Sequence, residues 1–430
     1  MNITRAGSLT LALLLMLAVI TGCSQSFLRQ GDEALKKQSY QQALAYYEQA
    51  LRERPGDPHV QRALGQAYYH LQNFDQAEKL LKAAQALIPE DGAITLYLGM
   101  IAETKKDFAG AAEFYAKFLA TNSKSPLAPQ IKGRLLYAQN EQMRNQVAEA
   151  VKNEKSLASQ TPAENTIGVL PFRVPAKASE DVNSLAQGMA AALWYDLASV
   201  KELQVVERLQ LKYLTDELAA ADKGFVAKNS GPRFGKFVKA QHLVTANLDS
   251  PAADKLSIQT GLINTGAGSY SPAFAADEQF SKAMKVQKEL TLAVLDSLGV
   301  KVSGSARREL KKAPTDSYSA FLAFGRGVDQ FDRGEYGKAD AFFIEAARID
   351  PSFDLAGNFH NQAQLLQAGS VDLQRFSGAV LTSISAKPAS GDGLGSELLG
   401  LSNPDTDPRH QDLPTTTGGT GSATVSGTIR

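Results

Sequence analysis

Cysteine is nearly absent from this chain of 430 residues, in which Cys23 is the only one. An intramolecular disulfide and a zinc site with several cysteine ligands are therefore excluded. Histidine is almost as scarce, and no two of the five histidines have the helical spacing that metal ligands share. The sequence thus predicts no metal site, and we interpret the Asp and His residues of segment 405–412 as part of a solvated tail.

An excess of charge of either sign is also missing. The 45 basic side chains balance the 45 acidic ones, whereas a protein that binds nucleic acid needs a basic surface for the phosphates. We therefore expect no nucleic-acid partner. With 43% hydrophobic and 21% charged residues the chain has the balance of a globular protein, and its length suggests two or three domains.

Signatures of catalysis are lacking as well. Segment 231–236 contains two glycines and a lysine, but it has one residue too few between the glycines for a phosphate-binding loop and no Ser or Thr after the lysine. Residues 173–177 follow a predicted strand at the place where many α/β folds bind a nucleotide, yet they are polar and contain proline instead of a glycine fingerprint. We expect a protein that is not an enzyme and needs no cofactor.

The longest apolar run lies near the N-terminus, at residues 9–20. It is too short to span a bilayer as a helix. Arg5 precedes it and the small residues Thr21 and Gly22 follow it, which is the order of regions in a secretory signal. We predict a signal peptide at residues 1–22.

The cleavage point coincides with the single cysteine. The sequence Ile20-Thr21-Gly22-Cys23 resembles the lipobox of bacterial lipoproteins. The resemblance implies cleavage before Cys23 and covalent lipid on it, and several acyl chains anchor a protein stably to a membrane. An Asp in the next position retains such proteins at the inner membrane, and this chain has Ser24. We therefore expect an anchor in the bacterial outer membrane, with the protein facing the periplasm.

A repeat of 34 residues follows, in stretches that begin at Ser24, Pro58 and Gly92. Glycine, alanine, aromatic and proline residues recur in phase, as in Gly31, Gly65 and Gly99, then Tyr40, Phe74 and Phe108, then Ala43, Ala77 and Ala111. The pattern resembles the tetratricopeptide repeat, a pair of antiparallel helices. One repeat cannot bury its apolar face, and three can stack. A long polar helix over 127–157 would cap the stack, which gives an array at residues 23–158.

The resemblance implies a concave groove that is lined by the first helix of each pair. The residues predicted to bind partner proteins in this groove are Asp32, Arg62, Gln66, Tyr69, Met100 and Glu103. The alternative for each of them is a solvated side chain that binds nothing, since most exposed polar positions are simply solvated.

Residues 163–300 no longer follow the helical repeat pattern. The apolar run at 165–172 predicts a buried strand that ends at Pro171. Helical and alternating segments follow in the order helix, strand, helix, several strands, helix, which predicts an α/β module with a mixed sheet. The segments Ile167–Phe172, Leu203–Arg208 and Ala240–Thr245 resemble the family that includes CsgG and the N-terminal domain of TolB.

That resemblance implies a small α/β fold used for protein–protein contacts in the bacterial envelope. The family includes adaptor lipoproteins and a secretion pore, so it admits a homo-oligomer. A pore inserts strands of about 9–11 alternating residues, and segment 210–239 shows no such pattern. This favours an adaptor, with a subunit of a CsgG-like secretion channel as the alternative.

Segment 223–239 contains basic residues and no acid. Its predicted partner-binding residues are Lys228, Arg233, Lys236 and Lys239, with Phe225, Phe234 and Phe237 among them. They could face an acidic protein, lipid headgroups or a cell-wall polymer. The alternative is a solvated face above core phenylalanines.

The repeat pattern returns near the C-terminus. Residues 316–351 match it in phase, and 353–367 predicts a capping helix, so we expect a further repeat over 314–370. One repeat alone would be unstable, and it should pack on the α/β module or on the first array. Residues 386–430 are rich in Gly, Ser, Thr and Pro and predict a disordered tail.

The sequence as a whole predicts an α+β multidomain protein: a tetratricopeptide array, a mixed-sheet α/β module and a further helical repeat. Its expected function is that of a lipid-anchored periplasmic scaffold. It would bind envelope proteins through the groove and the α/β module, in the assembly or secretion of envelope or surface structures.

Overall fold

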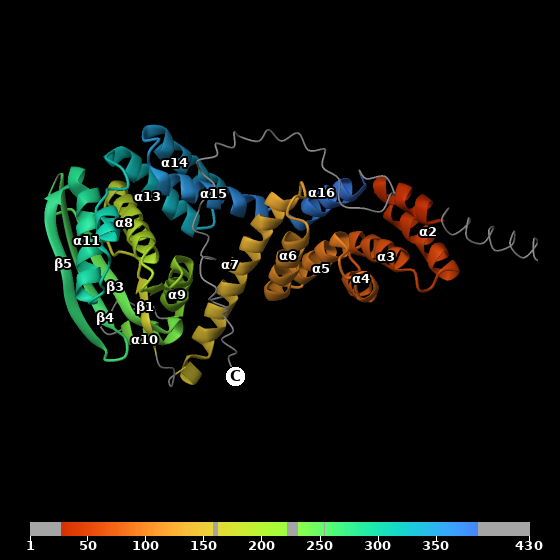
Figure 1. Cartoon of the computed structure of the whole chain (residues 1–430), viewed down its shortest axis with the longest axis horizontal. Coiled ribbons are helices and arrows are strands. Elements are labelled where there is room, and N and C mark those ends of the chain that lie inside the picture. Colours follow the sequence, from red (N-terminus) through yellow and green to blue (C-terminus); the bar gives the residue numbers. More distant parts are fainter. Residues whose placement is uncertain (1–26, 158–161, 222–230, 253, 386–430) are drawn as a thin grey trace, which may run out of the picture. The chain divides into compact units, whose positions relative to one another are not determined.

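The computed structural model describes residues 27–157, 162–221, 231–252 and 254–385 (Figure 1). The predicted signal peptide, the predicted lipid site Cys23 and the predicted tail after residue 385 lie outside these residues. The two helical parts of the prediction and the sheet-containing module between them are all present. The predicted fold class is confirmed.

The first array consists of antiparallel helix pairs. Residues 27–36 are helical, and the helices that follow are α2 (Tyr40–Glu53), α3 (Pro58–His70), α4 (Phe74–Leu87), α5 (Gly92–Thr104) and α6 (Phe108–Thr121). Side chains of Asp or Asn accept backbone N–H groups at the starts of α3, α4, α5 and α6, which satisfies donors that a helix start leaves free.

The recurring glycines explain the close approach of the two helices in each pair. A Cβ added to Gly65 would lie 2.6 Å from Cγ of Leu81, and one added to Gly99 would lie 2.8 Å from the ring of Tyr115. Large side chains on the second helix therefore fill the space that the glycines leave. This packing explains why glycine recurs at the same position of each repeat.

Helix α7 (Ala128–Lys152) and the short η1 (Glu154–Leu157) follow the array. The first half of α7 belongs to the apolar core of the array through Ile131 and Ala138. Its second half belongs to a core of the α/β module through Val147, with Met143 packed against the same core. One helix thus enters two cores.

The sheet has five strands in the order β2-β1-β3-β4-β5. They are β1 (Ala163–Val169), β2 (Gln204–Val205), β3 (Ala240–Asp249), β4 (Lys255–Asn264) and β5 (Ser269–Gln279). β1 is parallel to β2 and β3, and the other pairs are antiparallel. The predicted mixed sheet is confirmed, although β1 ends at Val169, two residues before the predicted stop at Pro171.

Helices cover both faces of this sheet. α8 (Glu180–Ala198) and α11 (Ala283–Ser297) share a core with Ile167 and Val244. α9 (Arg208–Ala221) and α10 (Gly231–Val238) share another with Leu243. Neighbouring residues of β3, Leu243 and Val244, therefore point to opposite faces, as the alternation of a strand requires. Segments 208–221 and 231–238 are helical, which agrees with the absence of an alternating pattern.

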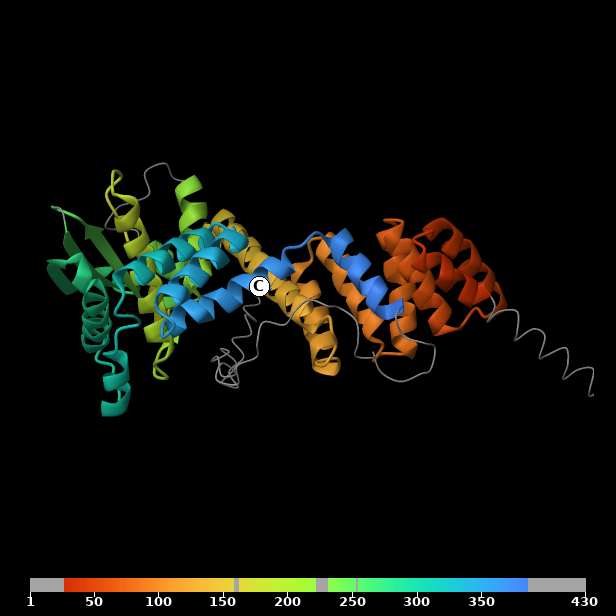
Figure 2. The ribbon, with the colours of Figure 1, turned by 90° about the horizontal axis from the view of Figure 1, so that it is seen from above.

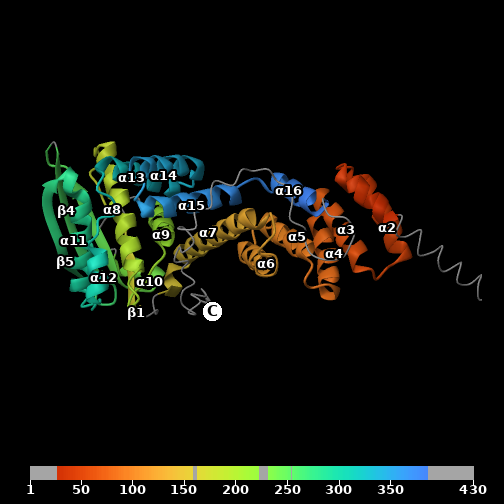
Figure 3. The ribbon, with the colours of Figure 1, turned by 45° about the horizontal axis from the view of Figure 1, so that its top comes forward.

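A second helical group follows the short α12 (Gly304–Leu310). Its helices are α13 (Tyr318–Asp332), α14 (Tyr336–Ile349), α15 (Asp354–Gly369) and α16 (Leu373–Ser385). α13 packs on α8 so closely that a Cβ on Gly325 would lie 1.8 Å from the carbonyl oxygen of Ser184. α15 packs on α7 (Figure 3), where a Cβ on Gly369 would lie 2.1 Å from the carbonyl oxygen of Gly133. The predicted packing of this repeat is confirmed, and it contacts both partners.

Candidate partner-binding groove

The last helix, α16, lies along the first array (Figure 2). Phe376 and Val380 of α16 belong to the apolar cluster that contains Tyr69, Met100 and Ile131 of the array. Leu381 belongs to the neighbouring cluster with residues of α3 and of helix 27–36. Tyr69 and Met100 lie on α3 and α5, the first helices of their pairs, and Ile131 lies on α7. α16 therefore occupies the groove that the repeat pattern predicts.

Arg134 of α7 connects the array to the start of α16. Its guanidinium is 1% exposed and donates to Oε1 of Glu103 at 2.7 Å. The same group donates to the backbone carbonyl of Val371 and lies 4.3 Å from the ring centroid of Phe376. A buried cation is stable only when it is paired and hydrogen-bonded, and this site provides an anion, a carbonyl and an aromatic ring.

A tyrosine hydroxyl adds a further polar contact to Glu103. Glu103 accepts a hydrogen bond from the hydroxyl of Tyr115 at 2.6 Å, and burial raises the pKa of Glu103 while Arg134 lowers it. Burial also raises the pKa of Tyr69 to about 12. Glu103 is thus paired with both Arg134 and Tyr115.

The structure places the six predicted groove residues in two groups. Gln66, Tyr69, Met100 and Glu103 are buried, so the alternative of solvated side chains does not hold for them. Arg62 forms an ion pair with Asp91 at 2.6 Å, and Asp32 accepts a hydrogen bond from Tyr47 at 2.8 Å. Their part in partner binding stays a prediction.

The sequence predicted no element at residues 371–385, so α16 was not expected. The signal is present but short. Asp372 accepts hydrogen bonds from the backbone N–H groups of Gln374 and Arg375 and so caps the helix. Leu373, Phe376 and Val380 then follow at helical spacing.

The basic segment does not form one surface among the described residues. Arg233 forms a two-pronged ion pair with Glu154, at 2.7 and 2.8 Å. Phe234 is buried and Lys239 is exposed. Lys228 and the side chain of Lys236 lie outside the described residues. A partner-binding role for this segment stays a prediction, and Phe234 fits the alternative of a core phenylalanine.

A buried charged cluster within the α/β module also went unpredicted. Asp196 of α8 accepts hydrogen bonds from Lys288 at 2.8 Å and from Gln287 at 2.9 Å. The hydroxyl of Thr291 donates to the same carboxylate at 3.0 Å. The cluster ties α8 to α11 and leaves the carboxylate well paired, so it serves packing.

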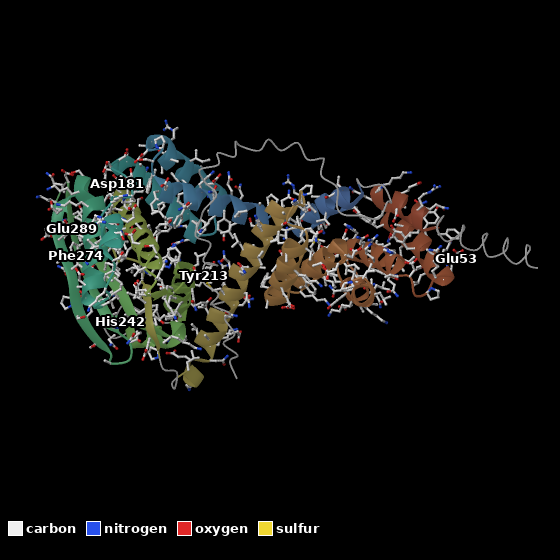
Figure 4. The ribbon with its side chains drawn as sticks, viewed as in Figure 1. Glu53, Asp181, Tyr213, His242, Phe274 and Glu289 are labelled. Carbon is white, nitrogen blue, oxygen red and sulfur yellow. The ribbon has the colours of Figure 1, made fainter. Side chains whose placement is uncertain are left out.

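Helix α7 also contacts α9 of the module. The guanidinium of Arg144 lies 4.8 Å from the ring centroid of Tyr213, which Figure 4 labels. Across the described ranges, no three or more His, Cys, Asp or Glu side chains gather in a way that could hold a metal ion. Among the helices that the structure describes, none is long and apolar enough to cross a membrane.

Antiparallel helix pairs, a 34-residue period and a groove on the first helices define a tetratricopeptide-repeat array. Two family models described as tetratricopeptide repeat match the sequence, at residues 34–96 and 71–126. These matches together cover residues 34–126. Protein–protein interaction is the class of function that such an array supports. A search of curated proteins found no match.

A comparison with solved structures found several that are similar to this chain. Yeast Tom70 is 16% identical, with a TM-score of 0.27, over 85% of this chain and 69% of that one. The TPR2AB domain of yeast Sti1 in complex with pHSP90 is 10% identical, with a TM-score of 0.27, over 81% and 99%. Naa15/Naa10 bound to HypK-THB is 16% identical, with a TM-score of 0.24, over 84% and 60%.

Proposed function

We propose that this protein is a lipid-anchored scaffold of the bacterial outer membrane that faces the periplasm. It brings proteins together in the assembly or secretion of envelope or surface structures. The observation that carries the proposal is α7, which belongs to the core of the repeat array at Ile131 and to a core of the α/β module at Val147. The repeat array and the α/β module are thus joined by one continuous helix.

The sequence supports the location. Cys23 lies at the end of a lipobox-like segment, and Ser24 follows it. The α/β module resembles the CsgG and TolB N-terminal family on its strand segments, and that family works in the envelope. The repeat array supplies a protein-binding surface, which supports an adaptor.

Replacement of Cys23 by Ala tests the anchor. In bacterial cells the wild-type chain should sediment with the outer membrane, and Cys23→Ala should leave it for the soluble periplasmic fraction. Ser24→Asp is the matched variant, because it keeps the cysteine and should move the protein to the inner membrane. If Cys23→Ala sediments with the outer membrane as the wild type does, the anchor proposal fails.

Cross-linking in cells followed by affinity purification tests the scaffold. Envelope proteins should be enriched with the wild-type chain and depleted with Cys23→Ala, because the anchor brings the scaffold to them. Equal enrichment with both chains would contradict a role that depends on the membrane.

A further inference from the structure

We propose that α16 is the chain's own ligand for the groove of the repeat array, and that it closes this groove until an amphipathic helix of a partner protein with the same anchor residues replaces it. The inference rests on the proposed scaffold function. It adds how access to the groove is controlled and which kind of partner the groove takes.

The apolar side of α16 shows what the groove binds. Phe376, Val380 and Leu381 are 3%, 0% and 5% exposed, and Leu373 packs partly buried beside them. On the other side, Gln374, Arg375 and Thr382 are exposed. Anchors at helical spacing with a polar opposite face are the pattern by which an amphipathic helix binds in a groove.

The polar contacts of Arg134 fix the direction in which the helix lies in the groove. Arg134 binds the carbonyl of Val371 just before the helix and stacks on the ring of Phe376. Ser377 is 3% exposed, and its hydroxyl donates to the backbone carbonyl of Gln374 within α16. A partner helix of this class therefore carries an aromatic residue in its first turn and aliphatic residues four and five positions beyond it.

The composition of α16 makes it a weak helix when it is free. It has 13 residues, a length at which isolated helices are marginal in water even when they are rich in alanine. Ser377, Gly378, Val380 and Thr382 all have lower helix propensity than alanine. A Cβ on Gly378 would meet no heavy atom within 4 Å, so packing does not require this glycine. α16 is thus helical because it is docked.

The groove also keeps a polar group that α16 does not satisfy. Gln66 is 5% exposed, and its Nε2 has no hydrogen-bond partner among the described residues. It lies one turn before Tyr69 on the same face of α3. A partner helix with stronger helix formers and an oxygen acceptor toward Gln66 would bind better than α16.

The short connection between α15 and α16 allows α16 to dissociate from the groove and bind to it again. α15 is held on α7 by the contact of Gly133 with Gly369, and it ends there. Only residues 370–372 join it to α16. Release of α16 therefore leaves the packing of α15 in place.

The test uses the full chain and a fluorescein-labelled synthetic peptide with the sequence of residues 371–385. Val380→Asp places a charge on the fully buried anchor and should release α16. This variant should bind the peptide at least about tenfold more tightly than the wild type, because apparent affinity is reduced by the fraction of closed molecules. The matched control is Thr382→Asp, which adds the same charge on the exposed side and should bind as weakly as the wild type.

Two results would overturn the proposal. One is equal binding of the peptide to the wild type and Val380→Asp, because α16 would then not close the groove. The other is a Val380→Asp chain that still unfolds cooperatively in urea but does not bind the peptide, because α16 would then not be a ligand. If Val380→Asp does not fold, Phe376→Ala replaces it, and the same two results decide.

This assay needs neither the lipid anchor nor an envelope partner. A failure of the peptide to bind would refute self-binding and leave the fractionation result for Cys23 intact. A failure of the fractionation would leave the groove result standing.

Discussion

The crossing of α7 and α15 allows a sharp test of the packing that joins the two helical groups. A Cβ on Gly133 would lie 2.1 Å from the carbonyl oxygen of Leu365 and 2.8 Å from the backbone nitrogen of Gly369. Both atoms belong to backbone, so no side chain can rotate away. We therefore expect Gly133→Ala to force the two helices apart.

The expected magnitude is the difference of two effects. Alanine in place of glycine stabilises a helix interior by up to about 1 kcal/mol. Overpacking costs about 1–3 kcal/mol, occasionally more, and a clash between two backbones belongs at the upper end. Gly133→Ala should therefore lower the free energy of unfolding by about 1–2 kcal/mol.

Gly357→Ala is the matched control, because Gly357 lies on α15 and a Cβ there would meet no heavy atom within 4 Å. This variant should be more stable than the wild type by up to about 1 kcal/mol. Urea unfolding followed by far-ultraviolet circular dichroism would measure both. Trp194, the only tryptophan of the chain, gives an independent fluorescence signal from α8. A Gly133→Ala midpoint equal to or above that of Gly357→Ala would refute the reasoning.

Three further predictions concern buried ionisable side chains. Arg134→Met leaves Glu103 buried without its cation and should cost about 3–5 kcal/mol of stability. Asp196→Ala leaves Lys288 buried without its anion and should lower the free energy of unfolding by about as much. Burial lowers the pKa of His70 from 6.5 to about 4. The neutral ring thus stabilises the fold above pH 6.5, and this stability, as much as about 3 kcal/mol, is lost as the pH falls from 6.5 to 4; His70→Gln should remove that loss.

Urea midpoints check all three, at pH 7 for the first two and at pH 7 and 5 for the third. Adding Glu103→Gln to Arg134→Met should recover part of the loss, and adding Lys288→Met to Asp196→Ala should do the same. No recovery in either double variant would contradict the charge argument. An unchanged pH dependence in His70→Gln would show that other groups cause it.

The repeat period made the first array predictable because its packing is local. Gly65 and Leu81, or Gly99 and Tyr115, belong to neighbouring helices, so their sizes must match within one repeat. The sheet was predictable for a related reason, since short β-rich runs bounded by turns recur in β3, β4 and β5. Such signals depend on residues that are close in sequence.

The position of the groove was predictable from the sequence, but the contacts inside it and the helix that fills it were not. Glutamate usually lies at the surface, and the burial of Glu103 depends on Arg134, which is 31 positions away. Arg134 in turn depends on Val371, 237 positions away. α16 was missed because Ser, Gly and Thr weaken its propensity, and only its place in the groove makes it a helix. Contacts over such separations leave no local pattern.

The helix shared by the two cores also limits how this protein can change length. Each residue inserted into an α-helix turns everything beyond it by about 100° and moves it by about 1.5 Å. An insertion or deletion in α7 between Ala138 and Val147 would therefore rotate one core away from the other and pull Gly133 or Tyr213 out of register. A substitution there changes one side chain, whereas a change in length displaces everything beyond it. Among homologous chains, the spacing between these two positions should be constant while the loops vary.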